Sequence, residues 1–186
     1  EHRRTPSASG SRDITIEALA ADKGLPACFL RKLDCEDANG NVVIPYHLPD
    51  GSPAPRSRLR TALAGNEGSR WMGSSEDGQI MPYGLDRLED ARRANCLHLV
   101  EGESDSWTLW HVGEPALGIP GAGQAGKIHA EDLEGIHRIY VVREPDRGGQ
   151  TFTSGVAERL AELDYRGECW VMDCGEEADP NDAYQG

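Results

Sequence analysis

The sequence predicts an α/β protein whose main sheet is mostly parallel, preceded by a smaller α+β lobe that contains a β-hairpin. From residue 84 onward, short apolar runs alternate with segments whose apolar residues recur at helical spacing. Before residue 84, Asn39-Gly40 stands ahead of the apolar residues 42–44, and Pro49-Asp50-Gly51 precedes a segment of alternating character, which is a hairpin pattern. The 186 residues, 38% of them hydrophobic, suffice for one globular unit or two small lobes.

We expect three regions along the chain. Residues 1–12 are polar and turn-rich and are expected to be a flexible lead-in. Residues 13–83 form the amino-terminal lobe, and residues 84–186 form the α/β domain. Because the first residue is not Met, we expect the chain to be part of a longer protein.

Two short helices are expected at the start of the amino-terminal lobe. Asp13 is placed to cap a helix that carries Ile16 and Leu19 on one face and ends near Gly24. A second helix is expected to begin at Pro26, since proline suits the first turn of a helix.

Arginines alternate in the strand that follows the Pro-Asp-Gly turn. Arg56, Arg58 and Arg60 would share one face of this strand, where planar guanidinium groups could bind phosphate. The alternative is a solvated edge strand whose charges prevent aggregation. Trp71, in a stretch predicted to be a loop beside Arg70, is a candidate for stacking on a base, and simple packing is the alternative.

Four strands and four helices are expected after residue 84. The expected strands are residues 96–100, 115–119, 138–142 and 169–172. The expected helices are residues 85–91, 104–112, 127–133 and 152–163. Right-handed crossovers would place these helices on both faces of the sheet.

Charge and cysteine content limit the class of protein. The net charge is −13, and residues 144–186 hold 3 basic against 11 acidic residues, which excludes a protein that coats DNA non-specifically. The five cysteines include no C-x-x-C pair, so we expect free thiols and neither a disulfide framework nor a zinc ribbon. No run of 18 apolar residues is present, so we expect a soluble, cytoplasmic protein with no membrane partner.

Carboxylates follow three of the expected strands. Glu101 comes after the first strand, Glu144 and Asp146 after the third, and Asp179 beyond the fourth. Because reactive groups of open α/β sheets lie beyond the carboxyl ends of strands, these side chains are expected to gather at one edge. They would repel one another unless a cation lay between them, and ligands that are all oxygen favour Mg²⁺ or Mn²⁺. The alternative is a set of acidic loops in solvent.

Three motifs resemble those of the TOPRIM domain, which bacterial-type primases, topoisomerases and some nucleases share. They are Val100-Glu101-Gly102-Glu103-Ser104-Asp105, Glu144-Pro145-Asp146-Arg147-Gly148-Gly149 and Ala178-Asp179-Pro180-Asn181-Asp182. Upstream, Val43-Ile44-Pro45-Tyr46 and Pro82-Tyr83-Gly84-Leu85 resemble the primase lobe that precedes TOPRIM. The resemblance covers nearly all of residues 13–186, and phage or mobile-element primases and primase-helicases are the most similar members.

The resemblance implies a metal-dependent nucleotidyltransferase that makes RNA primers on single-stranded DNA from nucleoside triphosphates. Mg²⁺ or Mn²⁺ would be held by Glu144, Asp146 and Asp179, and Glu101 would be a ligand, directly or through water, or a base. Nucleic acid or nucleotide would be bound by Arg56, Arg58, Arg60, Arg70 and Lys127. A helicase or a zinc-binding module elsewhere in the full-length protein would be a partner.

Two departures from the family pattern keep other functions open. Glu144 stands where the pattern has aspartate, and Ala178 where it has lysine. The alternatives are a TOPRIM nuclease that uses the same acids to activate water, and a nucleic-acid-binding module with altered catalysis.

A separate glycine pattern, Gly121-Ala122-Gly123-Gln124-Ala125-Gly126, matches a dinucleotide-binding fingerprint. The short polar helix after it favours a plain turn instead.

Overall fold

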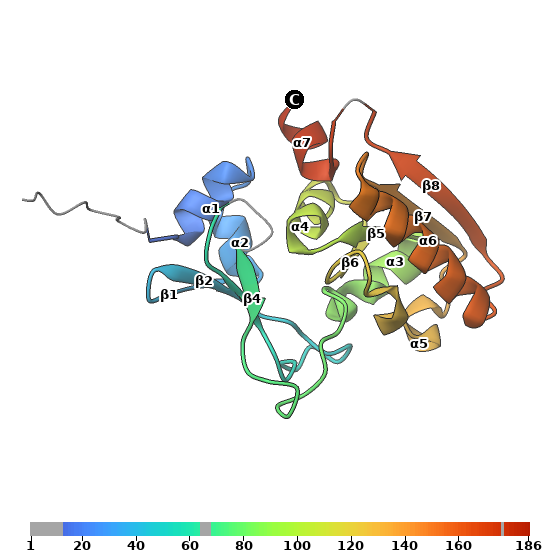
Figure 1. Ribbon diagram of the computed structural model, residues 1–186, viewed down its shortest axis with the longest axis horizontal. Helices are drawn as coiled ribbons and strands as arrows, with labels where there is room; N and C mark the ends of the chain where they lie inside the picture. Colours follow the sequence, from blue (N-terminus) through green and yellow to red (C-terminus); the bar gives the residue numbers. More distant parts are fainter. Residues whose placement is uncertain (1–12, 64–67, 176) are drawn as a thin grey trace, which may run out of the picture.

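The computed structural model describes residues 13–63, 68–175 and 177–186, so the lead-in expected over residues 1–12 lies outside the described residues. Two four-stranded sheets organise the described chain (Figure 1). The first has the strand order β1-β2-β3-β4 and is antiparallel, and the second has the order β6-β5-β7-β8 and is parallel. The predicted fold class is therefore confirmed. The domain boundary at residues 83 and 84 stays a prediction, and the two sheets lie on either side of it.

The amino-terminal lobe begins with helices α1 (Ile16–Asp22) and α2 (Ala27–Lys32). Thr15 caps α1, because its side-chain oxygen accepts a hydrogen bond from the backbone N–H of Ala18 at 3.2 Å. The prediction that Asp13 is the cap was wrong. Residue 14 lies outside the helix, and its N–H donates to the carbonyl of Gly40 at 2.8 Å, so the helix starts two residues later than Asp13 would require.

A hairpin of β1 (Glu36–Ala38) and β2 (Asn41–Ile44) turns at Asn39-Gly40, where both residues have positive φ. Strand β3 (Arg58–Arg60) pairs antiparallel with β2, and β4 (Ser69–Trp71) pairs with the other side of β3. Strand β3 is therefore an interior strand, which overturns the alternative of a protective edge strand. Trp71 lies in β4 and not in the expected loop.

The second half alternates helices and strands as expected. Its elements are η1 (Leu85–Arg87), α3 (Leu88–Ala94), β5 (Cys96–Glu101), α4 (Glu103–Val112), β6 (Ala116–Ile119), η2 (Ala125–Lys127), α5 (Ala130–Leu133), β7 (Arg138–Arg143), α6 (Arg147–Glu162), β8 (Glu168–Asp173) and α7 (Pro180–Gln185). Helix α6 begins five residues earlier than predicted, because Asp146 caps it. Helix α7 was not predicted.

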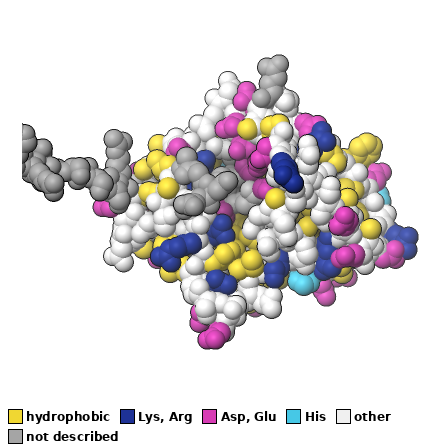
Figure 2. Space-filling view, in the orientation of Figure 1, with side chains coloured by type: hydrophobic (Ala, Val, Ile, Leu, Met, Phe, Trp, Pro, Cys, Tyr) yellow, Lys and Arg dark blue, Asp and Glu magenta, His cyan; other side chains and the backbone are white. Residues whose placement is uncertain are grey.

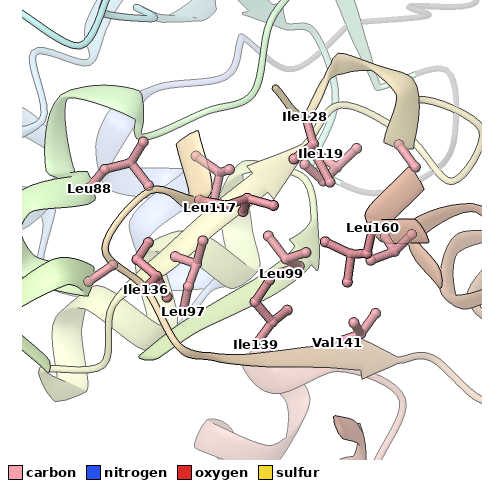
Figure 3. Close-up of a cluster of buried hydrophobic side chains, with 14 of the residues drawn as sticks. Leu88, Leu97, Leu99, Leu117, Ile119, Ile128, Ile136, Ile139, Val141 and Leu160 are labelled. Carbon is pink, nitrogen blue, oxygen red and sulfur yellow. The ribbon is translucent and has the colours of Figure 1, made fainter. Parts of the chain in front are cut away.

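The main core lies between the parallel sheet and helices α3, α5 and α6 (Figure 3). Leu97 and Leu99 of β5 point to this side together with Ile139 and Val141 of β7, and all four are buried. The opposite face packs against α4 through Val100, Leu109, Ala116 and Val142. Helices cover both faces of the sheet, as the crossover rule predicted.

Helix α4 also closes the core of the amino-terminal lobe. The Trp107 ring is 1% exposed and packs in that core with Tyr46 and Ile44. Its indole N–H donates to the Tyr83 hydroxyl at 2.9 Å. The helix that follows the first TOPRIM-like motif is therefore in contact with both sheets.

All five cysteines lie among the described residues, and each is a free thiol. Within the described ranges, no helix combines the length and the apolar character needed to cross a membrane.

Candidate active site at the carboxyl edge of the parallel sheet

Acidic side chains from three adjacent strands meet at one edge of the parallel sheet. Glu101 is the last residue of β5, and Glu144 follows the end of β7 directly. Asp146 caps α6, and Asp179 caps α7, which follows β8. Since β5, β7 and β8 are parallel neighbours, their carboxyl ends lie side by side.

Two glycines permit this arrangement. Gly102 has a φ angle of +96°, which residues with a side chain rarely adopt. This angle turns the chain sharply from the end of β5 into α4. A Cβ atom on Gly149 would lie 2.1 Å from the backbone oxygen of Glu144 and 2.6 Å from its nitrogen. The first turn of α6 can therefore lie against the backbone of Glu144 only because residue 149 has no side chain.

Asp146 and Asp179 occupy equivalent positions at helix starts. The Asp146 Oδ1 atom accepts a hydrogen bond from the N–H of Gly149 at 2.8 Å, and the Asp179 Oδ1 atom accepts one from the N–H of Asp182 at 2.8 Å. These bonds fix each carboxylate, and the helix N-terminus favours its negative charge. In the part of the chain that the structure describes, no hydrogen bond occupies the other oxygen, Oδ2, of either residue.

The electrostatics show that the acids share one environment. The pKa of Glu144 is raised to about 7. Partial burial is the largest cause, and the negative charges of Glu101 and Asp179 are the next largest. Burial and the charge of Asp146 raise the pKa of Glu101. The Glu101 Oε1 atom is buried and has no hydrogen-bond partner. An oxygen in that position costs free energy unless a cation or a proton satisfies it.

Asp105 belongs to the same cluster, and the sequence analysis did not select it. Its side chain is 4% exposed, and burial together with Asp179 and Glu144 holds its pKa well above the ordinary range. The sequence held a signal for this residue. Asp105 is the third residue after Gly102, where the helix begins, so it lies about one helical turn from the motif glycine. Figure 2 shows acidic side chains gathered around α4 and α7, with Lys and Arg side chains below them near β4.

The donor set suits a hard divalent cation in its chemistry. All the groups are carboxylate oxygens, one of them is buried without a partner, and the raised pKa values reflect burial first and mutual repulsion second, both of which a cation would offset. Within the ranges that the structure describes, no three such side chains stand close enough together to hold an ion. Binding of an ion would therefore require the carboxylates to draw together.

The predicted arginine face points inward. Arg58 and Arg60 lie opposite Ile44 and Val42 in the register of β3 and β2, and both of those residues are buried. The arginine face is therefore the one that looks toward the lobe's core and α4. One fifth of the Arg58 side chain is exposed, which leaves it open to a ligand on one side.

The remaining predicted basic residues are placed differently. Arg56 precedes β3, and its guanidinium donates to the carbonyls of Met72 and Gly73 at 3.0 and 3.2 Å. Arg70 pairs with Leu59 in the register, so it projects from the face opposite Arg58. Lys127 lies in η2 and donates to the Gln79 side chain at 3.1 Å, on the connection between the sheets. The structure therefore does not gather the five basic residues on one surface.

Two other candidates have structural roles. The Trp71 ring packs against Tyr46 at a centroid distance of 4.9 Å and lies beneath the guanidinium groups of Arg56 and Arg58, so it supports the arginines. The glycine pattern at 121–126 forms a turn that leads into the three-residue η2, which lacks the long helix of a dinucleotide-binding site.

Comparison with known proteins gives a likeness in structure only. No protein-family model and no curated protein sequence matches the chain. A primase DnaG catalytic domain solved with bound single-stranded DNA superposes with a TM-score of 0.67 at 14% identity, over 92% of this chain and 68% of that one. The chain has the fold of a DnaG-type primase catalytic domain.

Three further structures agree with this primase fold. The RNA polymerase domain of the Mycobacterium tuberculosis primase DnaG gives a TM-score of 0.66 at 13% identity, over 92% of this chain and 73% of that one. The zinc-binding and RNA polymerase domains of the Aquifex aeolicus primase give 0.60 at 18% identity, over 83% of this chain. The chain spans 41% of that Aquifex structure. A primase domain from Pseudomonas aeruginosa gives a TM-score of 0.57 at 16% identity, over 76% of this chain and 45% of that one.

Proposed function

We propose that the protein is a metal-dependent nucleotidyltransferase that joins ribonucleotides into primers on single-stranded DNA. The observation that carries this proposal is the carboxylate cluster at the edge of the parallel sheet, with the arginine face of β3 on the other side of α4. The likeness in fold to primase catalytic domains, one of them solved with bound single-stranded DNA, supports the proposal. We place the protein in the cytoplasm, with a helicase or a zinc-binding module of the full-length protein as its partner.

In this proposal, Glu144, Asp146 and Asp179 hold Mg²⁺ or Mn²⁺. The metal supplies activation of the attacking 3′-hydroxyl and stabilisation of the leaving pyrophosphate. Glu101 holds the proton or a water at its unpartnered Oε1 atom, as a base or a ligand through water. Asp146 is presented by the first turn of α6, which fixes its orientation before substrate binds.

Arg58 is proposed as the main contact to template or triphosphate phosphates, because it is both partly exposed and oriented by its neighbours. Its Nε and Nη2 atoms donate to the Ser69 hydroxyl at 3.2 and 2.9 Å, and it lies 5.0 Å from the Trp71 ring. Arg60 supports it from a more buried position, and Arg56, Arg70 and Lys127 are proposed to bind DNA outside this face.

The test is primer synthesis from labelled nucleotides on single-stranded DNA, first with Mg²⁺ and then with Mn²⁺. The proposal expects a ladder of RNA products that Asp146→Asn abolishes and that Glu89→Gln, a matched loss of charge at an exposed position of helix α3, leaves intact. Degradation of the template in place of synthesis would show a TOPRIM nuclease.

A second candidate is a nucleic-acid-binding module with altered catalysis. The observation that favours it is the spread of the carboxylates, since among the described residues no three form a ready ion site, and Glu144 is a longer side chain than the aspartate of the motif. DNA binding without synthesis or cleavage under either metal would establish this candidate. Recovery of synthesis by Glu144→Asp would instead show that the longer side chain is the only obstacle.

A further inference from the structure

The side chain of Glu103 lies between the arginine face and the carboxylate edge. Glu103 is the first residue of α4 and is 8% exposed, although it belongs to a residue type that is seldom buried. It is two residues beyond Glu101, and Gly102 turns the chain between them. The two neighbouring glutamates of the first motif therefore have separate surroundings.

Three groups of the amino-terminal lobe surround this buried carboxylate. The Tyr46 hydroxyl donates to the Glu103 Oε1 atom at 2.6 Å, and the Arg58 Nε atom lies 3.8 Å from the same oxygen. The charge of Glu103 also acts on the guanidinium of Arg60, where it offsets part of the lowering of the pKa caused by burial. Glu103 thus supplies negative charge to the arginine face, and Asp22 adds a smaller effect on Arg60.

The arginine face is not fully satisfied by this carboxylate. The Arg60 Nε atom is buried and has no hydrogen-bond partner, and within the described ranges Arg60 donates through Nη2 to the carbonyl of Leu63 at 2.7 Å. Arg58 at 3.8 Å from Glu103 is in ion-pair range but beyond hydrogen-bond range. Both guanidinium groups therefore retain donors for a second anion.

We propose that Glu103 is an internal counter-ion that competes with a substrate phosphate for Arg58 and Arg60. Phosphate bound at the arginines takes over the pairing, and Glu103 then keeps only its hydrogen bond from Tyr46. Because Glu103 begins α4, this exchange loosens the first turn of the helix next to Glu101. Phosphate binding on one lobe is in this way coupled to the first motif on the other, and Glu103 acts as a positioning residue.

This inference rests on the proposed function, since it takes the arginine face to be the phosphate contact. The ligand is a phosphate group, which a nucleoside triphosphate or a DNA backbone can supply. The two sources are separated by measuring ATP and an oligothymidylate in parallel, with EDTA present so that metal binding does not enter the result.

The first experiment compares Glu103→Gln with the wild type. Glutamine keeps the oxygen that accepts from Tyr46 and removes the competing charge, so affinity should rise by about tenfold for whichever probe uses the arginines. Tyr46→Phe is the control, because it loosens the same contact without removing the charge. Equal tightening in Tyr46→Phe, or unchanged affinity in Glu103→Gln, would overturn the inference.

Arg58→Ala separates the inference from the proposed function. If Arg58→Ala weakens binding while Glu103→Gln leaves it unchanged, the arginine contact stands and the counter-ion role is wrong. If Arg58→Ala also has no effect on either probe, the arginine face is not the phosphate contact, and both proposals are overturned.

A measurement on the wild-type protein does not depend on whether the variants fold. Amide hydrogen exchange in the first turn of α4 should rise when saturating ATP or oligothymidylate is added in EDTA. Unchanged or reduced exchange there, with the ligand bound, would overturn the coupling between the arginine face and the first motif.

Discussion

Individual carboxylates at the sheet edge have different environments, and these differences favour a different proposed role for each. Asp146 is exposed and already oriented by the N–H of Gly149, whereas Glu101 has a buried oxygen without a partner. A group that is exposed and oriented suits metal binding, and a partly buried carboxylate with a raised pKa suits proton transfer. The two acids can therefore be separated by experiment.

Asp146→Asn should weaken the stabilisation by metal. In the wild type, millimolar Mg²⁺ should raise the melting temperature, because an ion that binds only the folded state stabilises it by mass action. Asparagine keeps the cap on α6, so the fold should survive while most of the Mg²⁺-dependent shift is lost. Thermal melting with and without Mg²⁺ measures this, and an equal shift in both proteins would exclude Asp146 as a ligand.

Glu101→Gln should reduce turnover by roughly 100-fold or more, which is the range for a group that moves a proton. The affinity for Mn²⁺ without substrate should change much less than in Asp146→Asn, since Glu144 and Asp146 remain. One calorimetric titration and one rate measurement on each variant check this. Loss of metal binding as complete as in Asp146→Asn would make Glu101 a direct ligand instead.

The sequence predicted residues whose position follows from strand order alone. Glu101 ends β5, Glu144 and Asp146 follow the end of β7, and the carboxyl ends of neighbouring parallel strands lie at the same edge of the sheet. Asp105 and Glu103 were quoted within the first motif but were not predicted as part of the site. Their directions depend on where α4 begins and on how the amino-terminal lobe packs against it, and no short-range pattern encodes that packing.

At the scale of elements, all four strands of the parallel sheet were predicted, whereas the antiparallel sheet was predicted only in part. The strands β5, β6, β7 and β8 are apolar runs, whereas β1 and β4 are short, polar strands that exist only because they pair with neighbours. That pairing also made β3 an interior strand. Strand identity in such segments is decided by tertiary contacts, which override local propensity.

The junction between β7 and α6 should be intolerant of any side chain at residue 149. Gly149→Ala would place a Cβ atom 2.1 Å from the backbone oxygen of Glu144, and backbone cannot rotate out of the way as a flexible side chain can. We expect a loss of about 1–3 kcal/mol in the free energy of unfolding, typical of overpacking, together with weaker metal binding from displacement of Glu144.

Gly123→Ala is the matched control for Gly149→Ala. A Cβ atom there would meet no atom within 4 Å, so stability should be unchanged or slightly increased. Urea denaturation of both variants measures the two effects. Equal stability of the two variants would show that the loop of Glu144 can shift at little cost.

At the scale of the whole molecule, the carboxylate cluster makes metal-free protein sensitive to pH in an uncommon direction. Glu144 titrates near pH 7 in the folded protein against an ordinary value of 4.5, and the pKa values of Glu101 and Asp105 are raised as well. Between about pH 4.5 and 7 the folded state holds protons that the unfolded chain has released. The free energy of unfolding should therefore fall as the pH rises through this window.

The measurement is the melting temperature in EDTA at pH 5.5 and at pH 8, with the wild type compared with Glu144→Gln. The wild type should lose stability between these values, and the variant should lose less, because glutamine carries no charge to repel Glu101 and Asp179. Saturating Mg²⁺ at pH 8 should restore stability to the wild type, since the cation then takes the place of the protons. If the melting temperatures of the wild type and of Glu144→Gln change by the same amount between pH 5.5 and 8, these carboxylates do not share one site.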